Sequence, residues 1–244
     1  METATLANFK QKFNTPLPAW FKEIEEESNR RIVEAPFADI CRKGNKEAMK
    51  RLMVNLWPFV EIFPRLVRNG YMRLLHPTMY LQYGIINMIS LSYHSMMFLS
   101  SIERDEKSHR ELWINSSSAL GLSYPQDFGQ SVTPETHAWI DSVATKINPA
   151  DMFLAFVAIE FIAESVSKNF IQYDPFKNAF GAAKSGLGWF TVHTIDHGEI
   201  SHANLELHLS LAFRKDLEDS AKQNARSIIL GVVDKFLSAA NACV

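Results

Sequence analysis

Hydrophobic positions along this chain recur with the spacing of an α-helix over almost its whole length. Apolar residues return every three or four positions, and no long alternating run typical of a half-buried strand interrupts them. Glycines and prolines fall mostly between the periodic segments, where they mark boundaries. The pattern predicts helices at residues 5–13, 17–34, 46–69, 77–103, 105–121, 133–147, 149–172, 184–212 and 215–241.

Several predicted helix ends have a recognisable chemistry. Asn148-Pro149 and Thr133-Pro134 each place a side chain that can cap a helix before a proline that suits its first turn. Gly70, directly after Asn69, follows a helical run, and we interpret it as the end of that helix.

Length and composition fit one soluble, all-α domain that comprises residues 1–244. Hydrophobic residues make up 47% of the chain and charged residues 21%, and no interdomain linker is evident. The formal net charge of −2 gives no electrostatic case for binding nucleic acid.

The chain also carries no clear signal for export or for a membrane. Cys41 and Cys243 lie far apart, which fits a reducing compartment, and the first residues lack the features of a signal peptide. The most apolar stretch, residues 83–99, is interrupted by polar side chains, so we interpret it as a buried helix. We therefore expect a cytoplasmic protein with no membrane partner. The sequence leaves the oligomeric state open, with a homodimer as the expectation.

Glu160 is the clearest chemical anomaly. It is the only polar side chain between Met152 and Ala163, in a helix that is apolar nearly all round. A buried carboxylate is costly unless it is paired, protonated or bound to a metal. Glu160 is therefore a candidate metal ligand, with Glu164 one turn later as the alternate.

A second candidate is the pair Glu106 and His109. Glu and His three residues apart project to one side of a helix, and this spacing occurs in helical bundles that hold two iron or manganese ions. The surrounding charges also fit a solvated helix face, and Glu103 is a competing carboxylate.

The third candidate is the run from His193 to His202, which holds three imidazoles and two carboxylates. At about 100° per residue, His193 and His197 share one helix face with Asp196. The nearly opposite face carries the other ligand-type side chains, Glu199, His202 and Glu206. A straight helix cannot point both sets at one centre, so either one set is structural or the helix is distorted near Gly198, where glycine tolerates distortion.

The order of these residues resembles the haem-oxygenase-like helical superfamily, and more narrowly its CADD-like branch with the diiron oxidase relatives. The resemblance covers roughly residues 20–240. It rests on His109 ahead of Leu112-Trp113, on a lone Glu in a later apolar helix, and on the segment that begins Trp189-Phe-Thr-Val-His193. It implies a single-domain bundle of seven or eight main helices without haem, and a non-haem site for two metal ions.

Carried over to this chain, the resemblance assigns most ligands directly. His109 matches the first histidine, Glu160 the second acid, and His193 the first histidine of the third helix, while Glu106, or less well Glu103, supplies the first acid. The family's third helix reads His-x-x-x-Asp-x-x-His, and here the chain departs from it.

His197 stands where Asp is expected, and Ile200 stands where the last His is expected. Glu199 and His202 recover the rhythm only with an insertion of two residues. The predicted ligand set is Glu106, His109, Glu160, His193, His197, Glu199 and His202. The predicted metal is iron, with two ions by resemblance and the second site in question.

Three functions compete at this point. The first is a non-haem iron oxygenase or oxidase that acts on a small organic substrate with dioxygen, as the resemblance implies. The second is a non-catalytic ligand-binding or interaction module with a degenerate metal site. The third is a cofactorless enzyme, similar to the thiaminase or quinone-synthase branches of the same fold, with Cys41 as the expected pocket nucleophile of the thiaminase route.

Overall fold

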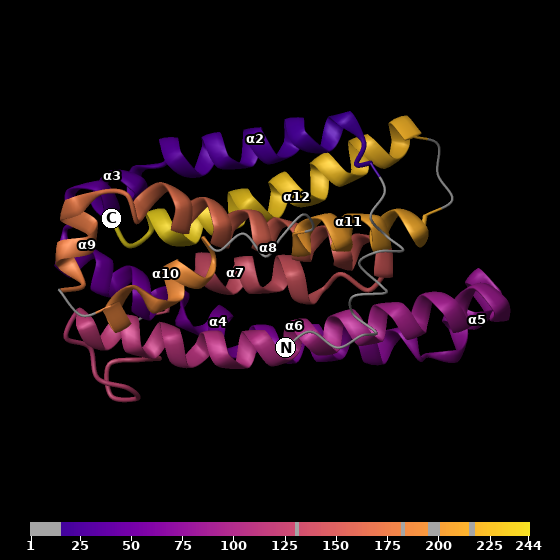
Figure 1. Cartoon of the computed structure of the whole chain (residues 1–244), viewed down its shortest axis with the longest axis horizontal. Coiled ribbons are helices and arrows are strands. Elements are labelled where there is room, and N and C mark those ends of the chain that lie inside the picture. Colours follow the sequence, from indigo (N-terminus) through magenta and orange to yellow (C-terminus); the bar gives the residue numbers. More distant parts are fainter. Residues whose placement is uncertain (1–15, 130–131, 182–183, 195–200, 215–217) are drawn as a thin grey trace.

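The computed structural model describes residues 16–129, 132–181, 184–194, 201–214 and 218–244, and within this part every regular element is helical. The elements are α2 (Ala19–Glu34), α3 (Pro36–Lys43), α4 (Lys46–Leu74), α5 (Pro77–Tyr83), α6 (Ile85–Ala119), α7 (Pro134–Ala144), α8 (Pro149–Phe170), α9 (Asp174–Ala179), the 3-10 helix η1 (Lys184–Leu187), α10 (Gly188–Val192), α11 (His202–Ala212) and α12 (Glu218–Asn241). The long helices run roughly parallel to one another in a single bundle (Figure 1). The predicted fold class, an all-α multi-helix bundle, is confirmed.

Helix α8 lies at the centre of this bundle. Its side chains are buried nearly all round, and α2, α11, α12, α4 and α7 pack against it. Asn148 caps its start, accepting a hydrogen bond from the Ala150 backbone N–H at 2.9 Å, and Pro149 occupies the first turn. The predicted start of this helix is therefore confirmed, and the apolar run that follows forms the core that surrounds Glu160.

The predicted end of α4 at Gly70 is wrong. The helix continues to Leu74, and Gly70 is buried inside it. A Cβ at this position would lie 2.8 Å from the Sδ atom of Met152 on α8. Gly70 thus permits the close approach of two helices, which a single sequence does not distinguish from a helix end.

The boundaries of the two predicted helices 77–103 and 105–121 differ from those in the structure. The break falls at Gly84, whose φ of 84° suits glycine, and α6 then runs unbroken through the charged segment around residue 105. Glu103 and Lys107 pair across one turn there, so the charges support the helix. By length and composition, α6 is the one helix in the described residues that could cross a membrane.

The predicted helix 184–212 is not continuous. Helix α10 ends at Val192 and α11 starts at His202, where Ser201 caps it by accepting from the Asn204 N–H. The predicted distortion at Gly198 and the predicted helix 5–13 lie outside the described residues. The short helices α3 and α9 were not predicted, since each is too brief to show a helical period.

Candidate functional site

Glu106 and His109 lie on one face of α6, as their spacing predicts. The His109 Nδ1 and Glu106 Oε1 atoms are 3.1 Å apart, and both side chains are largely buried. Burial alone would lower the pKa of His109, but the hydrogen bond and the negative charge of Glu106 outweigh it, so the pKa is raised. The pair therefore forms one polar wall of the site.

His193 approaches this pair from α10, where it occupies the C-cap position. Its ring centroid is 4.7 Å from that of His109 and 4.2 Å from the Trp189 ring. Burial, reinforced by the nearby His109, lowers the pKa of His193, which favours the neutral imidazole. His193 thus joins α10 to the α6 pair without adding a second positive charge.

Glu160, on α8, lies near these residues and is paired with His202. The His202 Nδ1 and Glu160 Oε1 atoms are 3.5 Å apart across α11 and α8. Burial would raise the pKa of Glu160, but His202, His193 and His109 together lower it. Glu160 is consequently the ionised carboxylate around which the histidines gather. Its side chain is 19% exposed, so it is half-buried where the sequence predicts a buried carboxylate, and its partner is His202.

We call Glu106, His109, Glu160, His193 and His202 the Glu/His cluster. The two histidines His193 and His202 both reach it because α10 and α11 are separate helices. On one straight helix they would point in nearly opposite directions, but each belongs to a separate helix here, and both contribute to the electrostatics of Glu160. His197 and Glu199, which were also predicted as ligands, lie outside the described residues.

Glu206 is a site residue that the sequence argument did not select. It lies one turn after His202 on α11, and its side chain is buried. Burial, with repulsion from Glu160 and Glu106, raises its pKa well above the ordinary value. The sequence does hold a signal for Glu206, because it follows His202 by four residues and so lies on the same helix face. That spacing places Glu206 near the site only once α11 is known to start at His202.

Neither alternate carboxylate joins the cluster. Glu103 is buried but forms ion pairs with Arg68 and Lys107. Glu164 forms an ion pair with Lys168, one turn along α8. Both carboxylates thus have cationic partners of their own.

The cluster has the donor set of a divalent metal site. One ligand atom each from Glu106, His109 and His193 lie within 4.8 Å of one another, so small rotations would bring all three to a shared ion. His193 also has the orientation common among metal ligands, because its Nδ1 atom lies 2.7 Å from the Trp189 carbonyl oxygen and leaves Nε2 available. The residues present therefore fit a metal ion.

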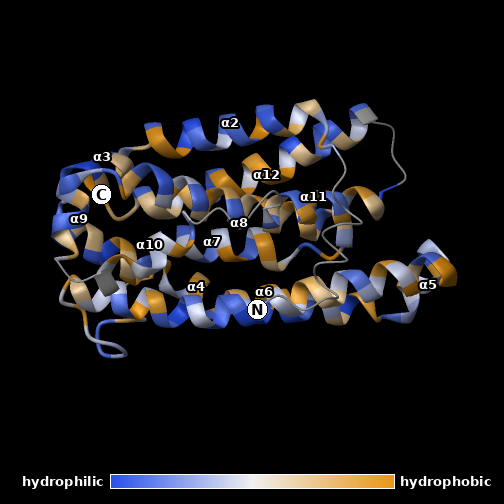
Figure 2. Cartoon of the chain, in the orientation of Figure 1, coloured by the Kyte–Doolittle hydropathy of each residue, from blue (hydrophilic) through white to orange (hydrophobic). Residues whose placement is uncertain are grey.

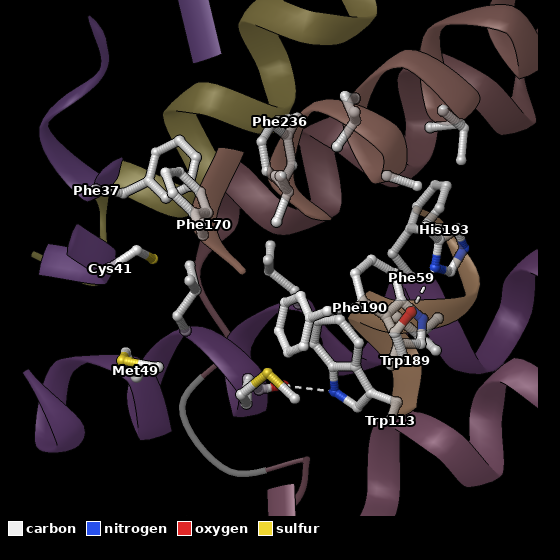
Figure 3. Close-up of a pocket in the computed structure, with 18 of the residues that line it drawn as sticks. Phe37, Cys41, Met49, Phe59, Trp113, Phe170, Trp189, Phe190, His193 and Phe236 are labelled. Atoms are coloured by element: carbon white, nitrogen blue, oxygen red, sulfur yellow. Dashed lines mark hydrogen bonds between the residues drawn. The ribbon is translucent and has the colours of Figure 1, made fainter. Parts of the chain in front are cut away.

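An apolar cavity opens from the cluster and extends toward α3. Figure 3 shows it from His193 at one end to Cys41 and Met49 at the other. Its empty volume is about 910 Å³, including the space at its mouth. Aromatic rings form much of its wall: Phe37, Phe59, Phe63, Trp113, Trp139, Phe170, Phe176, Phe180, Trp189, Phe190 and Phe236. Glu106, Glu160 and His193 are the polar groups at one end, an arrangement that fits a small-molecule pocket.

Cys41 lines this cavity, as the thiaminase route requires, but its surroundings make it a poor nucleophile. Burial raises the pKa of its thiol to about 12, and the thiolate is the reactive form. The Glu/His cluster lies at the other end of the cavity (Figure 3).

No family model and no curated protein matches this sequence. Solved structures do. A TenA homologue from Pseudomonas syringae pv. tomato str. DC3000 aligns with a TM-score of 0.72 and 18% identity, covering 93% of this chain and 93% of that one. A TenA homologue from P. horikoshii OT3 aligns with a TM-score of 0.54 and 16% identity, covering 96% and 97%. The chain thus has a TenA-like fold.

These neighbours correct the main functional prediction. Both solved structures are TenA homologues, which favours the thiaminase-like alternative over the non-haem iron oxygenase. The prediction went wrong because Glu and His at helical spacing match the ligand pattern of iron proteins, and the same side chains can also line an organic binding site. The non-catalytic alternative gains no support from either neighbour.

Proposed function

We propose that the protein is a thiaminase-like enzyme that binds a small aromatic heterocycle in the cavity and transforms it by acid–base chemistry at the Glu/His cluster. The observation that carries the proposal is the cavity with aromatic walls and one polar end. A flat ring gains stacking energy against such walls, while the carboxylates of Glu106 and Glu160 can accept hydrogen bonds from ring amino groups.

The aromatic walls are themselves held in place. The Trp113 indole N–H donates to the Met53 carbonyl oxygen at 3.1 Å, and Trp113 packs edge-on against Trp189 at 4.9 Å. Trp139 stacks on Phe59 at 3.9 Å. These contacts fix the rings around the space before a ligand enters, which reduces the entropy lost on binding.

His193 is the proposed general base. Because its Nδ1 atom faces a carbonyl oxygen, which can only accept, Nδ1 carries the proton and Nε2 keeps its lone pair. A substrate group or an attacking water molecule within hydrogen-bond reach of Nε2 can then transfer a proton to this nitrogen. This chemistry needs no thiolate, so Cys41 has no catalytic role in the proposal.

The test is binding followed by turnover. Thiamin and simple aminopyrimidines should quench or enhance the fluorescence of the cavity tryptophans, and chromatography should detect conversion of at least one of them. Saturable binding with product formation supports the proposal. Absence of both over the whole series contradicts it.

A divalent metal ion at Glu106, His109 and His193 is a second candidate, which the closeness of their ligand atoms favours. When bound, such an ion would act as a Lewis acid or activate a water molecule. Iron in particular, and membership of the CADD-like branch, stay predictions from the sequence, as does the cytoplasmic location. Metal analysis of the purified protein beside the His109→Ala variant tests the metal. About one ion per chain that the variant loses supports it, and equal trace content in both contradicts it.

A further inference from the structure

The end of the molecule formed by α5 and the first half of α6 exposes an unusual number of large apolar side chains. Leu81 on α5 is 87% exposed and Ile86 on α6 is 86% exposed. We call the following residues the α5–α6 patch: Leu81, Ile85, Ile86, Ile89 and Tyr93. Figure 2 shows apolar residues at this end, away from the C-terminus.

The α6 members of the patch form one stripe. At about 100° per residue, Ile85, Ile86, Ile89 and Tyr93 fall within an arc of roughly 100°. Met88 and Ser92, on another side of the helix, face the bundle and are buried. Only 33% of the apolar window of α6 is buried, so its first half is not a core helix like α8. The expectation from sequence that residues 83–99 form a buried helix is therefore wrong for this stripe.

The size of this surface matches one side of a protein interface. Met72 and Leu75, at the end of α4, are also exposed and extend the apolar surface at this end. Together these side chains present on the order of 700 Å² of largely apolar surface, against about 800 Å² per partner in a standard interface. A patch of this size is at or above the upper end of what a typical monomer exposes.

The charged residues near this surface indicate whether it binds a membrane or another protein. No Asp or Glu occurs between Ile62 and Ile102. Of the three arginines in that stretch, Arg68 pairs with Glu103, and Arg73 donates to the carbonyl oxygen of Lys146. Among the described residues this leaves at most two of these cations without a carboxylate partner, Arg65 and Arg73, whereas surfaces that bind anionic lipids carry clusters of about four to eight cations.

The patch itself is free of formal charge. From Ile85 to Ser101, α6 contains no Lys, Arg, Asp or Glu. The cores of protein interfaces are depleted in charge in the same way. A neutral stripe also meets an identical stripe without repulsion, which a strongly cationic one would not.

We propose that the α5–α6 patch joins two copies of this chain across a two-fold axis. In such an arrangement the same residues lie on both sides, and α6 of one protomer packs against α6 of its partner. The inference is independent of the proposed enzymatic function, because the patch does not include any residue of the cavity or the cluster.

Sedimentation velocity over a range of protein concentrations tests the proposal. The full chain should sediment as a dimer, and Ile86→Glu should weaken self-association by roughly 30-fold or more, since a buried unpaired charge disrupts an interface core. Val244→Glu, at an exposed apolar residue outside the patch, is the matched control and should leave the dimer intact. A monomer at all concentrations, or a dimer that Ile86→Glu leaves unchanged, would overturn the proposal.

Two further measurements keep the outcome clear. Circular dichroism should show that Ile86→Glu retains its helices. If Ile86→Glu loses them, Leu81→Glu replaces it as the patch variant in the sedimentation experiment. Ile86→Cys should form a disulfide-linked dimer under mild oxidation, because both native cysteines are buried. Flotation of the monomeric chain with vesicles of anionic phospholipid, in place of self-association, would show a membrane-docking surface and would contradict the proposal.

Discussion

The Nδ1 atom of His193 lies 2.7 Å from the carbonyl oxygen of Trp189, four residues earlier in the chain. This contact orients the imidazole in two ways. It fixes which nitrogen carries the proton, and it holds the ring against the Trp189 indole at 4.2 Å. Nε2 is therefore the nitrogen available for proton transfer, close to Glu106 and His109.

His193→Ala should lower kcat by roughly 10²–10⁴-fold while changing the dissociation constant of the ligand much less, because the variant loses a proton acceptor but keeps the aromatic walls. Steady-state kinetics and a fluorescence titration separate the two effects. His137→Ala, at an exposed histidine on α7, is the control and should behave as the parent chain. Retention of kcat within a few-fold in His193→Ala would rule out this role.

Cys41→Ala should keep kcat within about two-fold of the parent value, because the buried thiol is neutral and lies away from the cluster. For the same reason, iodoacetamide at pH 8 should modify the folded protein slowly. Mass spectrometry measures the modification, and an unfolded sample supplies the fully reactive reference. Loss of turnover in Cys41→Ala, with the fold intact, would restore the nucleophilic thiol expected from the sequence.

Ala163→Leu should weaken ligand binding by about ten-fold or more, since Ala163 lines the cavity one turn from Glu160 and a larger side chain would occupy the ligand's space. The free energy of unfolding should fall by no more than about 1–3 kcal/mol, the usual range for overpacking. Isothermal titration and chemical denaturation give the two quantities. Unchanged affinity would place the ligand elsewhere.

The stability of the bundle should depend on Glu27 in a pH-dependent way. Hydrogen bonds from Arg30 and Arg31 lower the pKa of Glu27 to about 2. A depressed carboxyl pKa contributes stability that is complete above the unfolded pKa and is lost as pH falls through the folded value. Glu27→Gln should therefore lower the Tm at pH 7 and lose this difference between about pH 4.5 and pH 2. An equal difference in Tm across that range would contradict the assignment.

Much of the bundle follows from local signals in the sequence. The cap at Asn148, the proline after it and the apolar run around Glu160 each predict α8 correctly, because they act within a few residues of one another. The role of Gly70 depends instead on Met152, which is far away in the chain. Glycine at a close helix contact and glycine at a helix end have the same appearance in a single sequence.

Part of the site also follows from local signals in the sequence, and part of it does not. Glu106 and His109 are fixed by their spacing on one helix, and the structure brings Glu160, His193 and His202 to them. These side chains converge because α10 and α11 are two separate helices. Hydrophobic periodicity does not show that the helix is interrupted between them. The function could not be predicted from these side chains, because carboxylate and imidazole suit a metal ion and an organic ligand alike.

Ligand binding at the Glu160 end of the cavity is tested by comparing Glu160→Gln with Glu164→Gln. Both changes remove one negative charge from α8, but only Glu160 lies in the cavity with His202 beside it. The measurement is the dissociation constant and turnover of an aminopyrimidine ligand. Glu160→Gln should lose at least about ten-fold in affinity and should lose turnover, whereas Glu164→Gln should be unchanged. Equal behaviour of the two variants would contradict ligand binding at this end of the cavity.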